Sequence, residues 1–381
     1  MNNEINYSSC YEDLRKCNNG FVDLIPLLSR RTPINIIVGS RGTGKSTGVA
    51  IMCLIDYLKN GYEFLYVRRR KDDIQMTAPG FFKNAIDIIN RNTEYKIDRF
   101  RYYNGEYQIG SVKEIDDKGK EVMEWVKCGE AKALSLEEKA KSSVLSKVRT
   151  IIYDEFISKN VNAYIGTKAD TEAEWRALCS LYQTVDRGID KPSRNETSMF
   201  LMANKSTIYN PICISLGIPD YYDPKARIIS QKKGRWAGLW SFYNVKSVPA
   251  TEDIKKSIAY AISDEVTQMY AYDNESAIDN DSSFIKRVKG TYHHTCNMSF
   301  KNEKYGLWRR SGNYYIDNPK PGEKFISLDV EGFEENAKNL IDQWRSSPIM
   351  CELRTAYTLG KLYFKDVKTK VVFLRYLQFM A

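Results

Sequence analysis

The stretch Ile34–Met52, INIIVGSRGTGKSTGVAIM, constrains the fold more than any other part of the chain. An apolar, β-branched run predicts a buried strand over 34–38, and the residues after it match the P-loop pattern G-x-x-x-x-G-K-S from Gly39 to Ser46. Glycines let the backbone turn so that several N–H groups point at one anion, and the helix that begins near Lys45 adds its positive N-terminal end. The sequence therefore predicts a strand, a phosphate-binding loop and a helix in succession.

The motif also predicts a chemical role for its side chains. Lys45 is expected to reach the β- and γ-phosphates of ATP, and the Ser46 hydroxyl to ligate Mg²⁺. Arg41, inside the loop, could contact the γ-phosphate or a neighbouring acid. The loop residues expected to bind ATP are Gly39, Ser40, Arg41, Gly42, Thr43, Gly44, Lys45, Ser46 and Thr47.

Two further apolar strands end in polar side chains. One, in RTIIYDEFI, is followed by Asp154 and Glu155, and the other, in SMFLMANKS, by Asn204. Ligands bind at the carboxyl ends of strands in an α/β sheet. Asp154 is therefore predicted to hold Mg²⁺ beside Ser46, and Glu155 to orient or deprotonate the water that attacks the γ-phosphate. Asn204 either joins this ATP site, as a γ-phosphate sensor or by positioning the water, or caps the next turn.

Strands and helices alternate through the first half of the chain. Together with the run EFLYV after the P-loop helix, four core strands predict an α/β fold with a doubly wound, mostly parallel sheet. The stretch from Tyr95 to Val126 is rich in Tyr, Ile and Val and contains turn signals at Asn104-Gly105 and Lys118-Gly119. It predicts antiparallel hairpins at one edge of that sheet.

With 381 residues, 43% of them hydrophobic, the chain is long enough for a nucleotide-binding domain and a second, smaller domain. We expect a P-loop ATPase domain over residues 1–220, a connecting subdomain over 221–281, and a separate α+β module over 282–381. The module carries 17 Lys and Arg against 10 Asp and Glu, which is +7 of the total formal charge of +9. This excess favours contact with a phosphate backbone.

Two shorter basic clusters are further candidates for nucleic-acid contact, with an ordinary solvated surface as the alternative for each. The first, directly after the second strand, consists of Arg68, Arg69, Arg70 and Lys71. The second lies around an apparent turn and consists of Lys232, Lys233 and Arg235.

Other classes of protein fit poorly. No run of eighteen apolar residues exists, and the beginning MNNEINYSSC lacks the features of a secretory signal, so we expect a soluble intracellular protein with no membrane partner. The eight cysteines form no C-x-x-C pair, and the two histidines, His293 and His294, are adjacent. Neither zinc binding nor histidine catalysis is indicated.

The motifs VGSRGTGKS, LYVRRRK, TIIYDEFI, TVDR and LMANKSTIYNP occur in this order. In them the chain resembles the phi-29-type DNA encapsidation ATPases of small podophages, relatives of the large terminases. The resemblance implies an ASCE-type P-loop ATPase that assembles as a homopentameric ring in the host cytoplasm. It also implies docking of that ring at the portal (connector) of an empty procapsid, where ATP hydrolysis pumps double-stranded DNA inward.

Residue by residue, the resemblance puts Lys45 and Ser46 at the phosphate and Mg²⁺ positions. Asp154 falls on the metal-side acid and Glu155 on the catalytic one. Arg187, in TVDR, falls on the arginine finger that completes the site of the neighbouring subunit. The C-terminal module is expected to resemble a vestigial RNase H-like terminase nuclease that contacts a packaging RNA.

An alternative is that this module is still a metal-dependent nuclease, which needs several converging carboxylates. Its candidate acids are Asp317, Asp329, Glu331 and Asp366, but their spacing and the lysines around them favour a nucleic-acid platform. Tyrosines and Trp308 in KYGLWRRSGNYY could stack on unpaired bases or pack a small core. A small-molecule kinase explains neither the basic module nor the arginine finger, and a purely structural ATP site has no use for Glu155.

Overall fold

The computed structural model describes residues 5–18, 20, 22–115, 117, 121–136, 145–158, 165, 173–187, 196–204, 208, 210–218, 221–223, 226–245, 255–263, 268, 291–300, 303–327, 347–358, 361–366, 369–370 and 373. The chain forms two compact units that meet along the sequence at residues 277 and 278.

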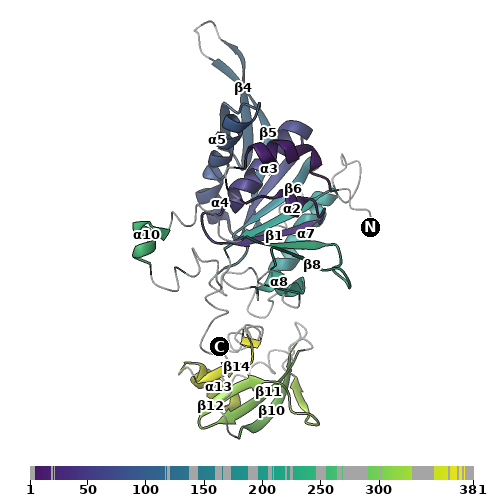
Figure 1. Cartoon of the computed structure of the whole chain (residues 1–381), viewed down its shortest axis with the longest axis vertical. Helices are drawn as coiled ribbons and strands as arrows, with labels where there is room; N and C mark the ends of the chain where they lie inside the picture. The colour runs from purple at the N-terminus through teal and green to yellow at the C-terminus, as the bar shows by residue number, and fades with distance from the viewer. Residues whose placement is uncertain are drawn as a thin grey trace. The chain divides into compact units, whose positions relative to one another are not determined.

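The first unit is built on a nine-stranded sheet of order β3-β4-β5-β2-β6-β7-β1-β9-β8 (Figure 1). Its five inner pairings, from β5 through β2, β6, β7 and β1 to β9, are parallel. The outer pairings β3–β4, β4–β5 and β8–β9 are antiparallel. The strands are β1 (Ile34–Gly39), β2 (Glu63–Arg68), β3 (Arg99–Tyr103), β4 (Glu106–Ile115), β5 (Glu121–Ala133), β6 (Val148–Asp154), β7 (Ser198–Ala203), β8 (Ile228–Ser230) and β9 (Trp240–Val245).

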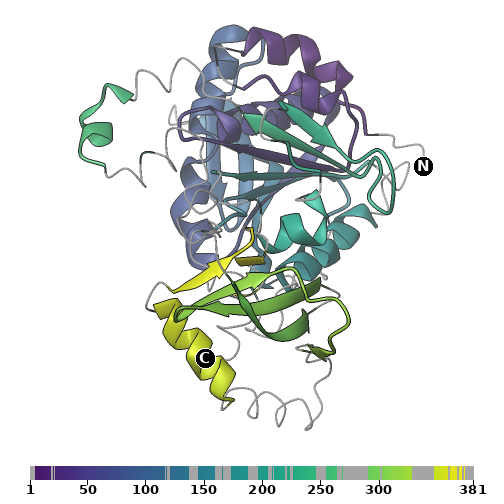
Figure 2. The same ribbon diagram turned by 60° about the horizontal axis from the view of Figure 1, so that its bottom comes forward.

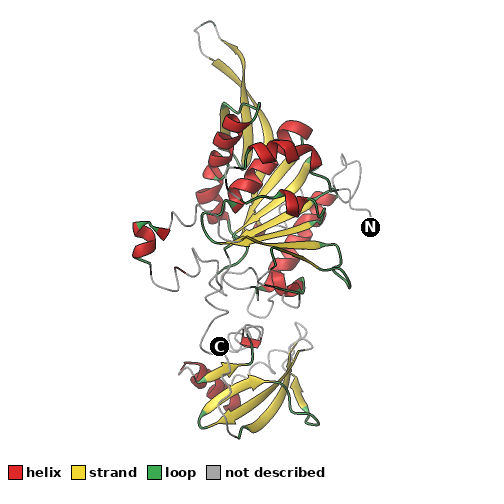
Figure 3. Ribbon diagram, in the orientation of Figure 1, coloured by secondary structure: helices red, strands yellow, loops and turns green. Residues whose placement is uncertain are grey.

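Helices cover both faces of this sheet (Figure 3), as the doubly wound prediction requires. Most of those described are short, and the longest of them is the P-loop helix α3. They are α1 (Tyr11–Lys16), α2 (Ile25–Leu28), α3 (Lys45–Asn60), α4 (Lys71–Thr77), α5 (Lys83–Asn92), α7 (Ala173–Asp186) and α8 (Pro211–Ser215), with 3₁₀ turns at Ser8–Cys10, Ala78–Gly80 and Leu134–Leu136. The short helix α10 (Ile258–Ala261) has no buried residue and does not cover the sheet.

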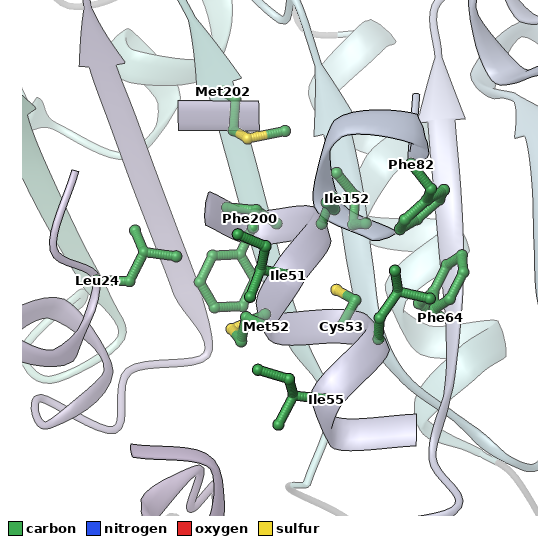
Figure 4. Close-up of a cluster of buried hydrophobic side chains, with 14 of the residues drawn as sticks. Leu24, Ile51, Met52, Cys53, Ile55, Phe64, Phe82, Ile152, Phe200 and Met202 are labelled. Atoms are coloured by element: carbon green, nitrogen blue, oxygen red, sulfur yellow. The ribbon is translucent and has the colours of Figure 1, made fainter. Parts of the chain in front are cut away.

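Successive residues of the inner strands point to opposite faces, which divides the core into two layers. Ile152 of β6 packs with α3, whereas its neighbours Ile151 and Tyr153 pack with α7. Figure 4 shows the α3 layer, in which Ile51, Met52, Cys53 and Ile55 lie against side chains of the sheet such as Ile152. Continuous apolar runs with both faces buried are what a parallel sheet requires.

The two edges of the sheet differ from each other. At one, β4 and β5 extend as a ribbon beyond the body of the sheet (Figure 1), which confirms the predicted antiparallel hairpins and adds that β5 continues into the parallel core. At the other, β9 pairs in parallel with β1, and Trp240 is fully buried. Residues 228–245 therefore belong to the first unit's sheet, and assigning them to a connecting subdomain was wrong.

The second unit contains a five-stranded mixed sheet of order β13-β10-β11-β12-β14, and among its described residues the helix α13 packs on this sheet (Figure 2). β10–β11 and β11–β12 are antiparallel, while β10–β13 and β12–β14 are parallel. The elements are β10 (His293–Phe300), β11 (Glu303–Arg310), β12 (Asn313–Asp317), β13 (Phe325–Ser327), α13 (Pro348–Thr358) and β14 (Leu362–Phe364). The core includes Leu307, Ile316 and Leu353 between the sheet and α13.

Candidate nucleotide site

The loop between β1 and α3 has the backbone that its glycines allow. Gly42 and Gly44 have φ values of 78° and 76°, in the left-handed region that side chains rarely adopt. Gly39 is restricted in a different way, because a Cβ there would lie 2.9 Å from the Cβ of Val245 in β9. The loop thus turns back over the start of α3 while packing closely on the neighbouring strand.

Lys45 lies at the centre of this loop. Its buried ammonium group donates to the carbonyl oxygens of Gly39 and Ser40 at 2.8 and 2.7 Å, and it lies 3.2 Å from Asn204 Oδ1. Burial lowers the pKa of Lys45 to about 8, an effect that Asp154 opposes and Arg41 reinforces. Lys45 is therefore expected to lose its proton as the pH rises through about 8.

Asp154 lies at the end of β6, next to the loop. Its Oδ1 is 3.5 Å from the Ser46 hydroxyl, and its Oδ2 accepts a hydrogen bond from Arg68 at 2.9 Å. Burial raises the pKa of Asp154, and the Arg68 guanidinium offsets part of that rise. Two hard oxygen donors, Ser46 Oγ and Asp154 Oδ1, therefore face each other where the motif predicts Mg²⁺.

Glu155 is the next residue, and its backbone is unusual. Its φ is 55°, a left-handed value that costs a residue with a side chain on the order of 1–2 kcal/mol. The turn directs the Glu155 carboxylate away from the sheet, so that 65% of the side chain is exposed although Phe156 after it is fully buried. Arg68 donates to the exposed carboxylate at 2.7 Å and so bridges the two acids.

A cavity of about 670 Å³ connects these groups. It is lined by the P-loop, the two acids, the end of β7 and one face of α5: Arg41, Gly42, Gly44, Lys45, Ser46, Thr47, Asn84, Asp87, Ile88, Arg91, Asp154, Glu155, Ala203 and Asn204. The α5 residues recur at i, i+3, i+4 and i+7, which places them on one helix face. No motif in the sequence indicates that this face of α5 lines the cavity.

The first basic cluster does not form one surface. Arg68 and Arg69 are each only 8% exposed, and both pair with carboxylates inside the protein. The prediction that these two side chains contact nucleic acid was therefore wrong, because acids at the end of β6 and at the start of α7 neutralise them. Arg70 and Lys71, at the start of α4, are exposed.

The other predicted residues of the first unit lie apart from the cavity. Lys232, Lys233 and Arg235 are exposed in the turn between β8 and β9, where the Arg235 guanidinium lies 4.8 Å from the Trp236 ring centre. Arg187 is exposed directly after α7 and is not among the described residues that line the cavity of its own chain.

In the second unit, four aromatic residues stand in register across neighbouring strands. His294 of β10 is opposite Trp308 of β11, which is opposite Tyr315 of β12, which pairs with Tyr363 of β14. Adjacent ring centres in this aromatic row are 5.0 Å apart for His294–Trp308 and 5.3 Å for Tyr315–Tyr363. The row lies on the face opposite α13, since its neighbours Leu307 and Ile316 pack against the helix.

The nuclease alternative gains no support from this unit. Within the described ranges, no group of three His, Cys, Asp or Glu side chains is placed to hold a metal. Asp366 Oδ1 accepts from the backbone and hydroxyl of Thr369. Asp329 and Glu331 lie outside the described residues.

Comparison with known proteins identifies the family. The family model for the podovirus DNA encapsidation protein (Gp16) matches residues 20–380. The chain belongs to the podovirus DNA encapsidation protein family. This confirms the resemblance inferred from the motifs.

Comparisons with individual proteins support the same family assignment. This encapsidation protein is 24% identical over 351 residues to the DNA packaging protein of Bacillus phage B103, covering 89% of this chain and 95% of that protein. Against the DNA packaging protein of Bacillus phage phi29, identity is 26% over 196 residues, or 51% and 49% of the two chains. The fold matches a chain of the bacteriophage Phi-29 genome packaging motor assembly with a TM-score of 0.63, 19% identity and coverage of 95% and 100%. A chain of the Phi-28 gp11 packaging motor matches with a TM-score of 0.52 and 16% identity, and the match covers 95% of this chain and 99% of that chain.

The search for membrane spans in the described part of the encapsidation protein found no helix with the length and apolar character needed to cross a bilayer.

Proposed function

We propose that this encapsidation protein is an ATPase that translocates double-stranded DNA into an empty procapsid. The observation that carries the proposal is the convergence of Lys45, Ser46, Asp154 and Glu155 on one cavity at the carboxyl edge of a parallel sheet. Two adjacent acids facing a P-loop lysine are the parts that phosphoryl transfer to water requires. Membership of the encapsidation family supplies the DNA-packaging context.

In this proposal the loop amides and Lys45 bind the phosphates of ATP, with Arg41 close by. Lys45 would exchange its bonds to the Gly39 and Ser40 carbonyls for phosphate oxygens. Ser46 and Asp154 fit Mg²⁺, since both offer hard oxygens 3.5 Å apart, and the bound ion would neutralise phosphate charge. Glu155 accepts the proton of the attacking water, and Asn204, already bonded to Lys45, orients either that water or the γ-phosphate.

Arg187 acts in the neighbouring subunit of a homopentameric ring. Its exposed position after α7, away from the cavity of its own chain, suits a residue that completes a site across an interface. A guanidinium supplied in trans stabilises transition-state charge once the neighbour has docked, which lets hydrolysis proceed in order around the ring. The ring would work in the host cytoplasm, at the portal of the procapsid.

DNA contacts are proposed for the exposed basic residues alone, namely Arg70, Lys71, Lys232, Lys233 and Arg235. The second unit is proposed as the contact for packaging RNA. Within its aromatic row, His294, Trp308 and Tyr363 are partly exposed and offer rings for unpaired bases, whereas Tyr315 is buried beneath Tyr292.

The decisive test is DNA-stimulated ATP hydrolysis by Lys45→Ala and Arg187→Ala proteins, each alone and then mixed. Each variant alone should be inactive, and the mixture should regain activity because intact sites form between the two kinds of subunit. A mixture that stays inactive while wild type is active would remove the role of Arg187 in trans. Hydrolysis by Lys45→Ala at the wild-type rate would remove the ATPase assignment itself.

A further inference from the structure

Arg69, the second arginine after β2, makes an unusually complete set of contacts. Its Nε and one terminal nitrogen donate to both oxygens of Glu174 at 2.8 and 2.9 Å. The same terminal nitrogen also donates to the carbonyl oxygen of Phe156 at 2.8 Å, and the other lies 3.4 Å from that of Glu155. Arg69 therefore holds the backbone of the turn that presents Glu155.

Glu174 is equally well satisfied and is fully buried. Besides Arg69, it accepts from the Tyr153 hydroxyl at 2.7 Å and from the backbone N–H of Ile165 at 2.9 Å. A buried carboxylate that is paired and hydrogen-bonded on both oxygens is strongly oriented. Glu174 therefore ties the first turn of α7 to the end of β6.

The turn so held is the one with the left-handed Glu155. A positive φ in a residue with a side chain persists when surrounding contacts over-determine it. Here Arg69 fixes the carbonyls of residues 155 and 156, and the Phe156 N–H donates to the Met202 carbonyl at 3.2 Å. Without Arg69, relaxation of the turn would move the Glu155 carboxylate relative to the cavity.

Glu174 lies in the first turn of α7, and Arg187 directly follows the last residue of the same helix. α7 runs unbroken from Ala173 to Asp186, and its buried face, including Leu178 and Leu181, packs on the sheet. A helix of this length behaves as a rigid rod of roughly 20 Å. A change in orientation at Glu174 is therefore carried to the residue that follows its last turn.

We propose that Arg69 and Glu174 form a positioning pair that holds Glu155 for hydrolysis in its own subunit and, through α7, sets the position of Arg187 for the neighbour. This inference rests on the proposed ATPase function. Neither residue is among the described residues that line the cavity, so the effect of the pair is on turnover and not on nucleotide binding.

The test uses the full chain with Arg69→Met and Glu174→Gln combined. This double change removes both buried charges, which avoids leaving one unpaired. The Gln oxygen can still accept from the Ile165 N–H, and the Gln NH₂ group can donate to the Tyr153 hydroxyl oxygen. We expect binding of a non-hydrolysable ATP analogue to stay within about threefold and kcat to fall by about tenfold or more, as small misplacements of catalytic groups do. Wild-type kcat in a folded double variant, or equal losses of kcat and binding, would overturn the proposal.

A matched control is a second buried arginine–carboxylate pair, Arg149 with Asp56 of α3, at the opposite end of β6. Arg149→Met combined with Asp56→Asn should lower the thermal midpoint while keeping kcat per folded protein. A fall in kcat equal to that of the Arg69 double variant would show that any buried pair matters through stability alone, which contradicts a positioning role.

Mixing separates the two halves of the proposal. Lys45→Ala subunits should restore hydrolysis to Arg187→Ala subunits, whereas subunits carrying the Arg69 and Glu174 changes should restore much less. Equal restoration would overturn the connection through α7. Failure of the proposed function is recognised separately, because the Lys45→Ala and Arg187→Ala mixture or wild type itself would then be inactive.

Discussion

Cations at the nucleotide cavity and cations on the outer surfaces of the protein have different partners. Lys45 lines the cavity and is held by loop carbonyls, and Arg68 and Arg69 are buried beside the lining and bind carboxylates. We call these three the cavity cations. On the surfaces, the guanidinium groups of Arg235 and Arg309 lie over the rings of Trp236 and Tyr314. A carboxylate neutralises a guanidinium, whereas a ring orients it and leaves its charge available to a phosphate.

The difference shows why a run of basic residues is a poor guide to a binding surface. Arg68, Arg69, Arg70 and Lys71 are consecutive, but the first two complete internal ion pairs and the last two face solvent. The position of a basic residue in the sequence does not indicate which carboxylate it pairs with in the folded protein. We expect the cavity cations to govern chemistry and the surface cations to govern binding of nucleic acid.

The largest effect is expected at the acids that the cavity cations hold. Glu155→Gln should reduce ATP turnover by about 10²-fold or more, because a general base contributes on that scale. Binding of an ATP analogue should be retained, since Lys45 and Ser46 are unchanged. The measurement is steady-state hydrolysis together with fluorescence titration. Turnover at the wild-type rate would show that Glu155 is not the general base. It would also contradict the expectation that the cavity cations act by holding a catalytic acid.

The state of charge of Lys45 gives the second prediction. Because its pKa is lowered to about 8, the protein without nucleotide loses this proton as pH rises through 8, and the phosphates lose a cation. Affinity for an ATP analogue should therefore fall by up to about tenfold per pH unit above 8, the limit for one proton taken up on binding.

Lys45→Arg is the matched control for this profile. A guanidinium stays charged across the range from about pH 7 to about pH 9.5, so its affinity should be nearly independent of pH even if it is weaker. Parallel profiles for the two proteins would show that Lys45 is not the group that titrates.

The third prediction concerns the aromatic row of the second unit. Trp308→Ala should weaken binding of single-stranded RNA by about fivefold to tenfold, the lower range for loss of one stacked base. His293→Ala is the control, because His293 neighbours His294 in β10 but its side chain points to the other face of the sheet. Equal effects of the two changes, measured by fluorescence anisotropy, would contradict stacking on the row.

Much of the fold and of the cavity could be predicted from sequence because the signals are local. The P-loop spacing fixes a strand, a loop and a helix, and the buried runs before Asp154 and Asn204 end at the same edge of a parallel sheet. Long-range pairing was not predictable in the same way. Nothing near Arg69 indicates that its partner is Glu174, 105 residues away, and nothing near Trp240 indicates a strand beside β1.

The smallest effect is expected where surface charge acts alone, in the turn between β8 and β9. Reversing Lys232, Lys233 and Arg235 to Glu together should weaken DNA binding and reduce the slope of log affinity against log salt by about 0.9 for each phosphate that the turn no longer neutralises. ATP hydrolysis without DNA should be unchanged, because none of the three is among the described residues that line the cavity. Lys113→Glu, on the exposed part of the β4–β5 ribbon, controls for a general loss of positive charge. If Lys113→Glu alters the slope as much per charge as the triple change, the turn is not a specific binding site for DNA. The effect of the surface cations on DNA binding would then depend only on the net charge of the protein and not on their position.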